Sequence, residues 1–261
     1  MKQSIPILMY HLVAPQTSAA FRKYTVTPEA FARQMAWLAR RHYTPIDLDA
    51  LIECRAGRTT LPPRPIVITF DDGYQACADH VVSLLKAHDF TAVIYLVAGL
   101  AGELSHWLMA ERGVEYPIMD WDTACQISAD GIRIGSHTVS HPRLPEISDA
   151  QCRAELLTSR HIIEDQLGCE VRHLAYPFGK FDARVKALAI EAGYHTACSV
   201  SVGFSAPGDD LFALQRVPVL GTDSLIDFIW RLYTARSLSE WWDRKARGAY
   251  KLMRGHGAQS A

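Results

Sequence analysis

The stretch IVITFDDGY, Ile66 to Tyr74, is an apolar, β-branched run that ends abruptly in two adjacent carboxylates and a glycine. Such a run favours a buried strand. Neighbouring residues of a strand point to opposite faces, so Asp71 and Asp72 can serve different roles just past its end. Two adjacent carboxylates repel each other unless a cation or a proton relieves them. The alternative is a strand end whose acids cap the following helix, which would explain one aspartate better than two.

Similar apolar runs alternate with helical patterns along the chain. The candidate strands are Ile5–Tyr10, Pro65–Phe70, Ala92–Val97, Ile132–Gly135, Arg172–Tyr176, His195–Val200 and Phe212–Val217. This alternation predicts an α/β fold, with a mostly parallel sheet and helices outside it. Seven strands in one continuous unit predict a distorted (β/α)7 barrel, and a doubly wound open sheet is the alternative.

Helix boundaries are marked by capping residues. Thr27 followed by Pro28 indicates the start of one helix, and Gly168 indicates the end of another over Asp149–Leu167. The segment Leu100–Met119 fits no element and is expected to be a loop insertion at one rim of the barrel.

The last part of the chain differs from the rest. We expect the barrel over residues 1–221 and a C-terminal helical extension over residues 222–261, with helices at Ser224–Thr234 and Leu238–Met253. This extension is basic, with interleaved tryptophans. A basic aromatic helix can make a peripheral contact with an anionic membrane. The alternative, which we favour, is a helix that docks on the barrel through its tryptophans and exposes its basic face.

The composition is that of an ordinary globular protein. Its 261 residues are 49% hydrophobic and 21% charged, with a formal net charge of -1, so nothing points to nucleic acid as a partner. The six cysteines include no C-x-x-C pair and are expected to be buried, reduced thiols. The apolar run before His11 is too short for a secretory signal. We therefore expect a cytoplasmic protein, at the inner face of the membrane if the basic segment binds lipid. The sequence indicates no oligomeric state.

A second motif, IGSHTVSH from Ile134 to His141, directly follows another predicted strand. His137 and His141 are spaced i, i+4, so one helical turn or a compact loop brings both imidazoles together. Two imidazoles and one carboxylate suit a catalytic zinc-like ion with an open position for water. Non-haem iron oxygenases use the same ligand types, so the ligands alone do not choose the reaction.

A third motif, LAYPFGKFD from Leu174 to Asp182, ends a predicted strand in a Pro-Phe-Gly turn. Backbone N–H groups of such a turn could receive a developing oxyanion. All three motifs lie at the carboxyl ends of predicted parallel strands. Tyr10 and His11 lie at the same end of the first strand. In a barrel these ends form one face, which is where active sites lie.

The motifs TFDDGY, SHTVSH and YPFG, in this order and at these distances, resemble the polysaccharide deacetylase family (carbohydrate esterase family 4, the NodB homology domain). The resemblance covers residues 5–219 and implies a distorted (β/α)7 barrel. It also implies that Asp72, His137 and His141 hold a divalent metal. In this family the metal is usually Zn²⁺, and Co²⁺ or Ni²⁺ can substitute.

The same resemblance makes Asp71 the general base that takes a proton from the metal-bound water. It assigns the oxyanion to the metal and to the backbone N–H of Phe178. In many members an arginine at the start of the third motif pairs with the base, but that position is Ala175 here. Arg216, beside the last predicted strand, is the candidate to orient Asp71. The alternative for Arg216 is a surface ion pair.

The general acid is also missing from its usual place. Many members carry it on a late Leu-x-His motif, but the last predicted strand is followed by no histidine until His256. Some members of the family have a circularly permuted barrel. They resemble the enzymes that partly deacetylate poly-N-acetylglucosamine exopolysaccharides, and their first strand ends in Met-Tyr-His. The stretch LMYHLV, Leu8 to Val13, matches that start, so the resemblance implies that His11 supplies the acid. The alternative is a strand-end histidine bonded to backbone. Tyr10 and Tyr176 are further candidates to orient the site or line the substrate groove.

The resemblance implies a hydrolase that removes the N-acetyl group of an acetamido sugar and releases acetate. The substrate would be a poly- or oligosaccharide, or its lipid-linked or nucleotide-linked precursor. The alternatives are a related sugar amidohydrolase, such as a deformylase, and a metal-retaining glycan-binding pseudoenzyme. A phosphatase fits poorly, because its phospho-aspartate signature needs Asp-x-Asp and the two aspartates here are adjacent.

Overall fold

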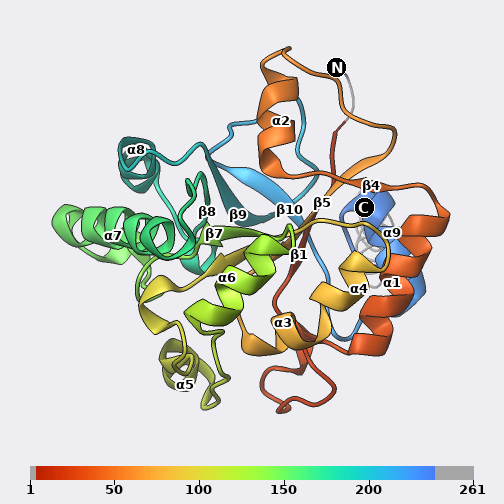
Figure 1. The fold of residues 1–261 in the computed structure, drawn as a ribbon, viewed down its shortest axis with the longest axis horizontal. Helices are drawn as coiled ribbons and strands as arrows, with labels where there is room; N and C mark the ends of the chain where they lie inside the picture. The colour runs from red at the N-terminus through yellow and green to blue at the C-terminus, as the bar shows by residue number, and fades with distance from the viewer. Residues whose placement is uncertain (1–3, 239–261) are drawn as a thin grey trace, which may run out of the picture.

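The structure, a computed structural model, describes residues 4–238. Parallel strands form a closed barrel in the order β1-β10-β9-β8-β7-β6-β5, and β1 pairs with β5 to close it (Figure 1). The barrel strands are β1 (Ile7–Tyr10), β5 (Pro65–Phe70), β6 (Val93–Leu96), β7 (Arg133–Ser136), β8 (His173–Ala175), β9 (Thr196–Val202) and β10 (Leu214–Pro218). These strands confirm the predicted distorted (β/α)7 barrel, and the open-sheet alternative is wrong.

Short strands and helices surround the barrel (Figure 1). The strand β4 (Thr44–Pro45) extends the sheet beside β5, while β2 (Leu12–Val13) and β3 (Thr25–Val26) pair with each other. The helices are α1 (Pro28–Arg40), α2 (Leu48–Arg55), α3 (Gln75–His80), α4 (Val82–Lys86), α5 (His106–Arg112), α6 (Trp121–Ala129), α7 (Asp149–Leu167), α8 (Ala183–Glu191) and α9 (Leu225–Thr234). Thr27 caps α1 by accepting a hydrogen bond from the Ala30 N–H, and Gly168 ends α7 with a φ of 66°, as the sequence predicts.

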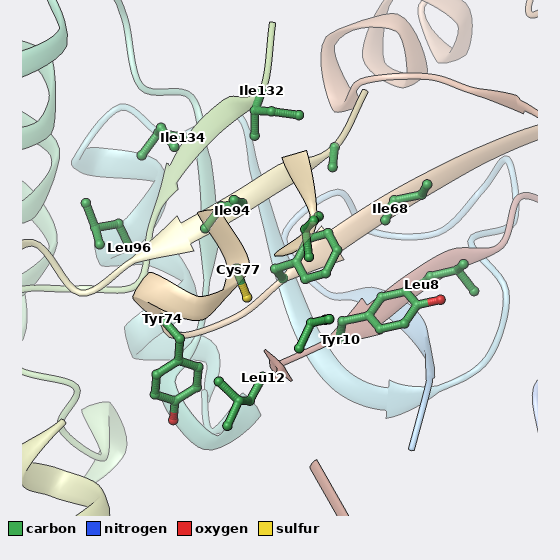
Figure 2. Packing of buried hydrophobic residues seen from close by; sticks show 14 of the residues in the cluster. Leu8, Tyr10, Leu12, Ile68, Tyr74, Cys77, Ile94, Leu96, Ile132 and Ile134 are labelled. Atoms are coloured by element: carbon green, nitrogen blue, oxygen red, sulfur yellow. The ribbon is translucent and has the colours of Figure 1, made fainter. Parts of the chain in front are cut away.

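Strand side chains alternate between the barrel interior and the layer beneath the helices. On β5, Val67 packs inside the barrel, whereas Ile68 and Phe70 pack outside it. Figure 2 shows this outer layer, in which Leu8 and Tyr10 of β1 lie among outward side chains of β5, β6 and β7. This alternation continues past the strand ends and decides which polar residues reach the mouth of the barrel.

Two expectations about the surface need correction. The segment Leu100–Met119 is not a plain loop, because α5 lies within it and ends at Gly113 with a φ of 69°. The helix has seven residues and buries one of them, Leu108, so its apolar periodicity is too weak to recognise. Of the cysteines, Cys125 and Cys169 are exposed rather than buried, although all six are free.

The helix α9, in the part of the chain where we expect a C-terminal extension, packs on α1. Ser224 caps α9 in a capping box with Asp227, and the ring of Phe228 packs against Trp37 at 6.5 Å between centroids. Most of the second expected helix, Leu238–Met253, lies outside the described residues, and so do both interpretations of it, docking on the barrel and contact with a membrane. Within residues 4–238, no helix combines the length and apolar character needed to span a membrane.

Candidate active site and metal centre

Three buried side chains from two motifs converge at the carboxyl end of the barrel. Oδ1 of Asp72 lies 3.4 Å from Nε2 of His137 and 3.4 Å from Nε2 of His141. One ligand atom of each residue lies within 4.8 Å of the other two. All three residues also line the same cavity, so the cluster keeps one open side. Two imidazoles and a carboxylate with an open side fit a divalent cation.

The rings of both histidines are held by their surroundings. Nδ1 of His137 lies 2.7 Å from the carbonyl oxygen of Ala175. A carbonyl can only accept, so Nδ1 donates this bond, and in the neutral ring the lone pair on Nε2 is available to a metal. The ring of His141 lies between Trp107, stacked at 4.5 Å, and Phe178, edge-on at 4.5 Å. Both imidazoles are therefore oriented before any ion binds.

The residues of the cluster shift one another's pKa values. Burial alone would raise the pKa of Asp72, but hydrogen bonds with the two histidines hold that pKa well below its usual range. Burial would lower the pKa of His137, but its bond with Asp72 and the nearby charge of Asp71 raise it above the ordinary 6.5. For His141 burial prevails, and its pKa is lowered. The site thus offers an ionised carboxylate to a cation.

The backbone is strained at this site. Asp72, Thr138, His141 and Phe178 have φ values of 75°, 69°, 61° and 55°, in the left-handed region that non-glycine residues avoid. Each such residue costs on the order of 1–2 kcal/mol. They make up half of the eight non-glycine residues with positive φ in the described part of the chain. Strain concentrated around one cavity is typical of a functional site.

The second aspartate has a different partner. Arg216 donates two hydrogen bonds to the Asp71 carboxylate, at 2.6 Å and 2.7 Å. Arg216 is fully buried, so the alternative of a surface ion pair is wrong. Burial would raise the pKa of Asp71, but the charge and hydrogen bonds of Arg216 outweigh it and lower that pKa. Asp71 is therefore ionised and fixed in orientation.

An irregularity in the sheet helps to hold Arg216. Leu214 of β10 pairs with Cys198 of β9, but Arg216 pairs with Val202, so β9 carries extra residues between these two points. In this irregular stretch, the carbonyl oxygen of Ser199 accepts a bond of 2.9 Å from Nε of Arg216. The shift in register thus supplies a partner for Arg216 inside the barrel.

His11 lies just after β1 and lines the same cavity. Its ring packs against Tyr24 at 5.2 Å between centroids, and its carbonyl oxygen accepts a bond of 3.1 Å from the thiol of Cys77. Burial lowers the pKa of His11, while the charges of Asp71 and Asp72 oppose that effect. The histidine is thus held at the mouth of the barrel beside both aspartates.

The third motif forms one wall of the cavity. Phe178 and Gly179 both have positive φ, and a Cβ on Gly179 would lie 2.4 Å from Cγ2 of Val200, so glycine is required there. The guanidinium of Arg143 lies 4.2 Å from the ring centroid of Phe178 and is also bonded to Glu111 at 2.6 Å. The turn that carries the Phe178 N–H is thus fixed from two sides.

The structure does not bring Tyr10 or Tyr176 into the groove, where the sequence analysis expected them. Tyr10 points out of the barrel, stacks on Phe70 and donates a bond of 2.8 Å to Gln34. The hydroxyl of Tyr176 donates to the carbonyl oxygen of Phe212. Met9 rather than Tyr10 lines the cavity, because neighbouring strand residues face opposite sides.

The cavity has a volume of about 450 Å³. Several of the residues that line it were not predicted from the sequence. These include Lys23, Tyr24, Trp107, Glu111, Arg112 and Arg143. The three residues numbered 107–112 belong to α5, inside the segment expected to be a loop. Arg143 lies two residues past the second motif, and this proximity was the one available signal.

Known proteins resemble this chain in sequence and in fold. The polysaccharide deacetylase family model matches residues 58–197. YxkH, a candidate polysaccharide deacetylase of Bacillus subtilis (strain 168), is 25% identical over 222 residues, which are 82% of this chain and 71% of that protein. A poly-β-1,6-N-acetyl-D-glucosamine N-deacetylase of Escherichia coli (strain K12) is 36% identical over 72 residues, or 28% of this chain and 11% of that protein.

Two solved structures show the same fold. The deacetylase PplD of Streptococcus pyogenes, in complex with acetate, has a TM-score of 0.77 at 20% identity, over 89% of this chain and 99% of that chain. IcaB from Ammonifex degensii has a TM-score of 0.76 at 20% identity, over 90% of this chain and 97% of that chain. Because the family model spans more than half of the sequence, this chain belongs to the polysaccharide deacetylase family.

Proposed function

We propose that this protein removes the N-acetyl group from an acetamido sugar and releases acetate, in a metal-dependent reaction. The substrate would be a poly- or oligosaccharide, or its lipid-linked or nucleotide-linked precursor. One observation carries the proposal: two adjacent carboxylates lie in one cavity with different partners. Asp72 contacts two imidazoles, while Asp71 is bonded to Arg216. The named activities of the E. coli relative and of a chitooligosaccharide deacetylase from Azorhizobium caulinodans, 27% identical over 133 residues, support the substrate class.

Asp72, His137 and His141 would hold the metal, which we propose to be Zn²⁺, with Co²⁺ or Ni²⁺ as substitutes. The donor set fits such an ion, because one oxygen and two oriented ring nitrogens face the cavity. When bound, a divalent cation supplies Lewis acidity, which lowers the pKa of water and polarises the amide carbonyl. The remaining steps fall to side chains of this chain.

Asp71 would act as the general base. Its carboxylate takes a proton from the attacking water, whose oxygen forms a bond to the carbonyl carbon of the acetamide. Arg216 keeps Asp71 ionised and aimed, since it binds both carboxylate oxygens. The backbone N–H of Phe178 would donate to the negative oxygen that develops on the former carbonyl.

His11 would act as the general acid. It gives its proton to the sugar nitrogen as the C–N bond breaks, so that acetate and a free amine leave the site. Its position supports this role. Three histidines of the described residues line the cavity, and His11 is the one that does not belong to the metal cluster. Burial lowers the pKa of His11, which makes its protonated form a stronger proton donor.

The experiment is an assay of acyl release by the purified full chain, loaded with Zn²⁺, Co²⁺ or Ni²⁺. We expect acetate from at least one of a chitooligosaccharide, poly-β-1,6-N-acetylglucosamine and UDP-N-acetylglucosamine, and its loss after chelation. Formate release from an N-formyl sugar, without acetate release, would identify a deformylase instead. Stoichiometric metal without release of either acid would favour a glycan-binding protein and contradict the proposal.

A further inference from the structure

The cavity carries more positive charge than its own residues neutralise. Its lining includes the cations Lys23, Arg112, Arg143 and Arg231. Arg143 is paired with Glu111 at 2.6 Å, and Arg231 is paired with Asp223 at 2.8 Å. Neither Lys23 nor Arg112 forms an ion pair with a carboxylate of residues 4–238. Two cations at the mouth of the cavity therefore remain without a counter-charge in the described part of the chain.

These two cations share one aromatic platform. The guanidinium carbon of Arg112 lies 4.8 Å from the ring centroid of Tyr24, and Nη2 of Arg112 donates to the Tyr24 hydroxyl at 3.3 Å. Nζ of Lys23 lies 5.8 Å from the same centroid. The cations come from separate segments, the last turn of α5 and the short 3-10 helix Arg22–Tyr24. Lys23 and Arg112 therefore both place their positive charge next to the ring of Tyr24.

The same ring places the cations beside the proposed proton donor. Tyr24 packs on His11 with ring centroids 5.2 Å apart. His11 would protonate the nitrogen on the second carbon of the sugar. Substituents on the two neighbouring ring carbons, the anomeric carbon and the third carbon, would therefore lie close to His11. Of these two, the anomeric carbon is the one that carries phosphate in activated sugars, and Arg112 and Lys23 lie beside His11 to receive it.

We propose that Lys23 and Arg112 form an anion subsite for a phosphate on the anomeric carbon of the acetamido sugar. The preferred substrate is then a glycosyl phosphate or pyrophosphate rather than a neutral polysaccharide, an inference that rests on the proposed function. A guanidinium presents a fork of donors that matches phosphate oxygens, and an ammonium adds a point charge. A neutral glycan would leave both charges unused.

The first test compares two sugars of the same anomeric configuration that differ only in the group on the anomeric oxygen, a charged phosphate in one and a neutral methyl in the other. They are N-acetylglucosamine 1-phosphate and methyl N-acetylglucosaminide. We expect kcat/KM for the phosphate to be at least about tenfold higher, as for one good charged contact. The preference should shrink as ionic strength rises, because the cations are at the surface. Equal kcat/KM for the two sugars would overturn the proposal.

Variants assign the effect to the two residues. In the double variant K23Q/R112Q, the ratio of the two kcat/KM values should fall at least tenfold, mainly through KM for the phosphate. The single variant R112K should retain most of the ratio. The matched control is R22Q, which removes an exposed cation from the same 3-10 helix but outside the cavity. A ratio that survives in K23Q/R112Q, or that falls equally in R22Q, would contradict the assignment.

Two further arms identify the carrier and separate this inference from the proposed function. UDP-N-acetylglucosamine and a short prenyl pyrophosphate-linked N-acetylglucosamine present the same phosphate on different carriers, and the better substrate identifies the source. Calorimetric binding of N-acetylglucosamine 1-phosphate to the D71N variant needs no turnover. If no sugar is deacetylated, the proposed function fails. Binding that is lost in K23Q/R112Q still supports the anion subsite, and binding that is unchanged contradicts it.

Discussion

The guanidinium of Arg216 binds both carboxylate oxygens of Asp71 inside the barrel, although 145 positions separate the two residues in the chain. Asp71 follows β5, and Arg216 lies on β10, which is joined to β5 through β1. The arginine that many family members carry before the third motif is absent here, because that position is Ala175. Barrel closure brings a guanidinium to the same carboxylate from another strand.

The variant R216K keeps the positive charge but cannot make both bonds. We expect kcat to fall by about 10²-fold, because a displacement of the base by about 1 Å can cost that much. Arg216 lowers the pKa of Asp71, and a base must be deprotonated. The acidic limb of the kcat/KM profile should therefore move to higher pH in R216K. A lower rate with an unmoved limb would contradict the orienting role, since a merely structural defect would not shift the profile.

The variant W107A removes the ring stacked on His141. We expect Zn²⁺ affinity to fall by about 10–100-fold, because groups that orient a ligand contribute that much. Competition with a chelating dye measures the affinity. M109A, at an exposed position of the same helix, is the control and should bind the metal like the unaltered protein. Equal affinities for the two variants would show that the Trp107 ring does not support the site.

Metal affinity should depend on pH in a definite direction. A histidine must be neutral to bind a metal, and in the empty site the pKa of His137 is raised above 6.5. Below this raised pKa the metal must displace a proton from His137, so its apparent affinity should fall as the pH drops. The expected slope below that pKa is about tenfold per pH unit for each displaced proton. Titrations with Zn²⁺ between pH 6 and pH 8 that gave one constant affinity would be inconsistent with this ligand.

The variant H11A should lose turnover and keep its metal. We expect kcat to fall by about 10²–10⁴-fold, the usual contribution of a general acid. Metal content should stay unchanged, because His11 is not in the cluster of Asp72, His137 and His141. H195A, at an exposed histidine beside β9, serves as the control. Near-normal turnover in H11A would remove the acid role.

Much of the architecture follows from local pattern. The strands β1, β5 and β6 are apolar runs, and each motif lies at a strand's carboxyl end, so the barrel and the convergence of Asp72, His137 and His141 could be predicted. The α5 helix could not, because it is short and buries one side chain. The residues that it adds to the cavity were missed with it.

Orientation across the sheet was the other limit. Whether Met9 or Tyr10 faces the cavity depends on how β1 pairs with β5, and a shift of one residue exchanges the two. The burial of Arg216 depends on the irregular pairing of β9 with β10, which leaves no local pattern in the sequence. Both features arise from contacts between distant segments.

The most direct test of metal-dependent deacetylation is acetate release by D71N at measured metal content. The substitution keeps the shape of the base but removes its ability to take a proton, and it leaves Asp72, His137 and His141 in place. The account predicts one bound metal per chain and acetate release reduced by about 10²–10⁴-fold relative to the unaltered protein. Near-normal acetate release from D71N with the metal bound would contradict it.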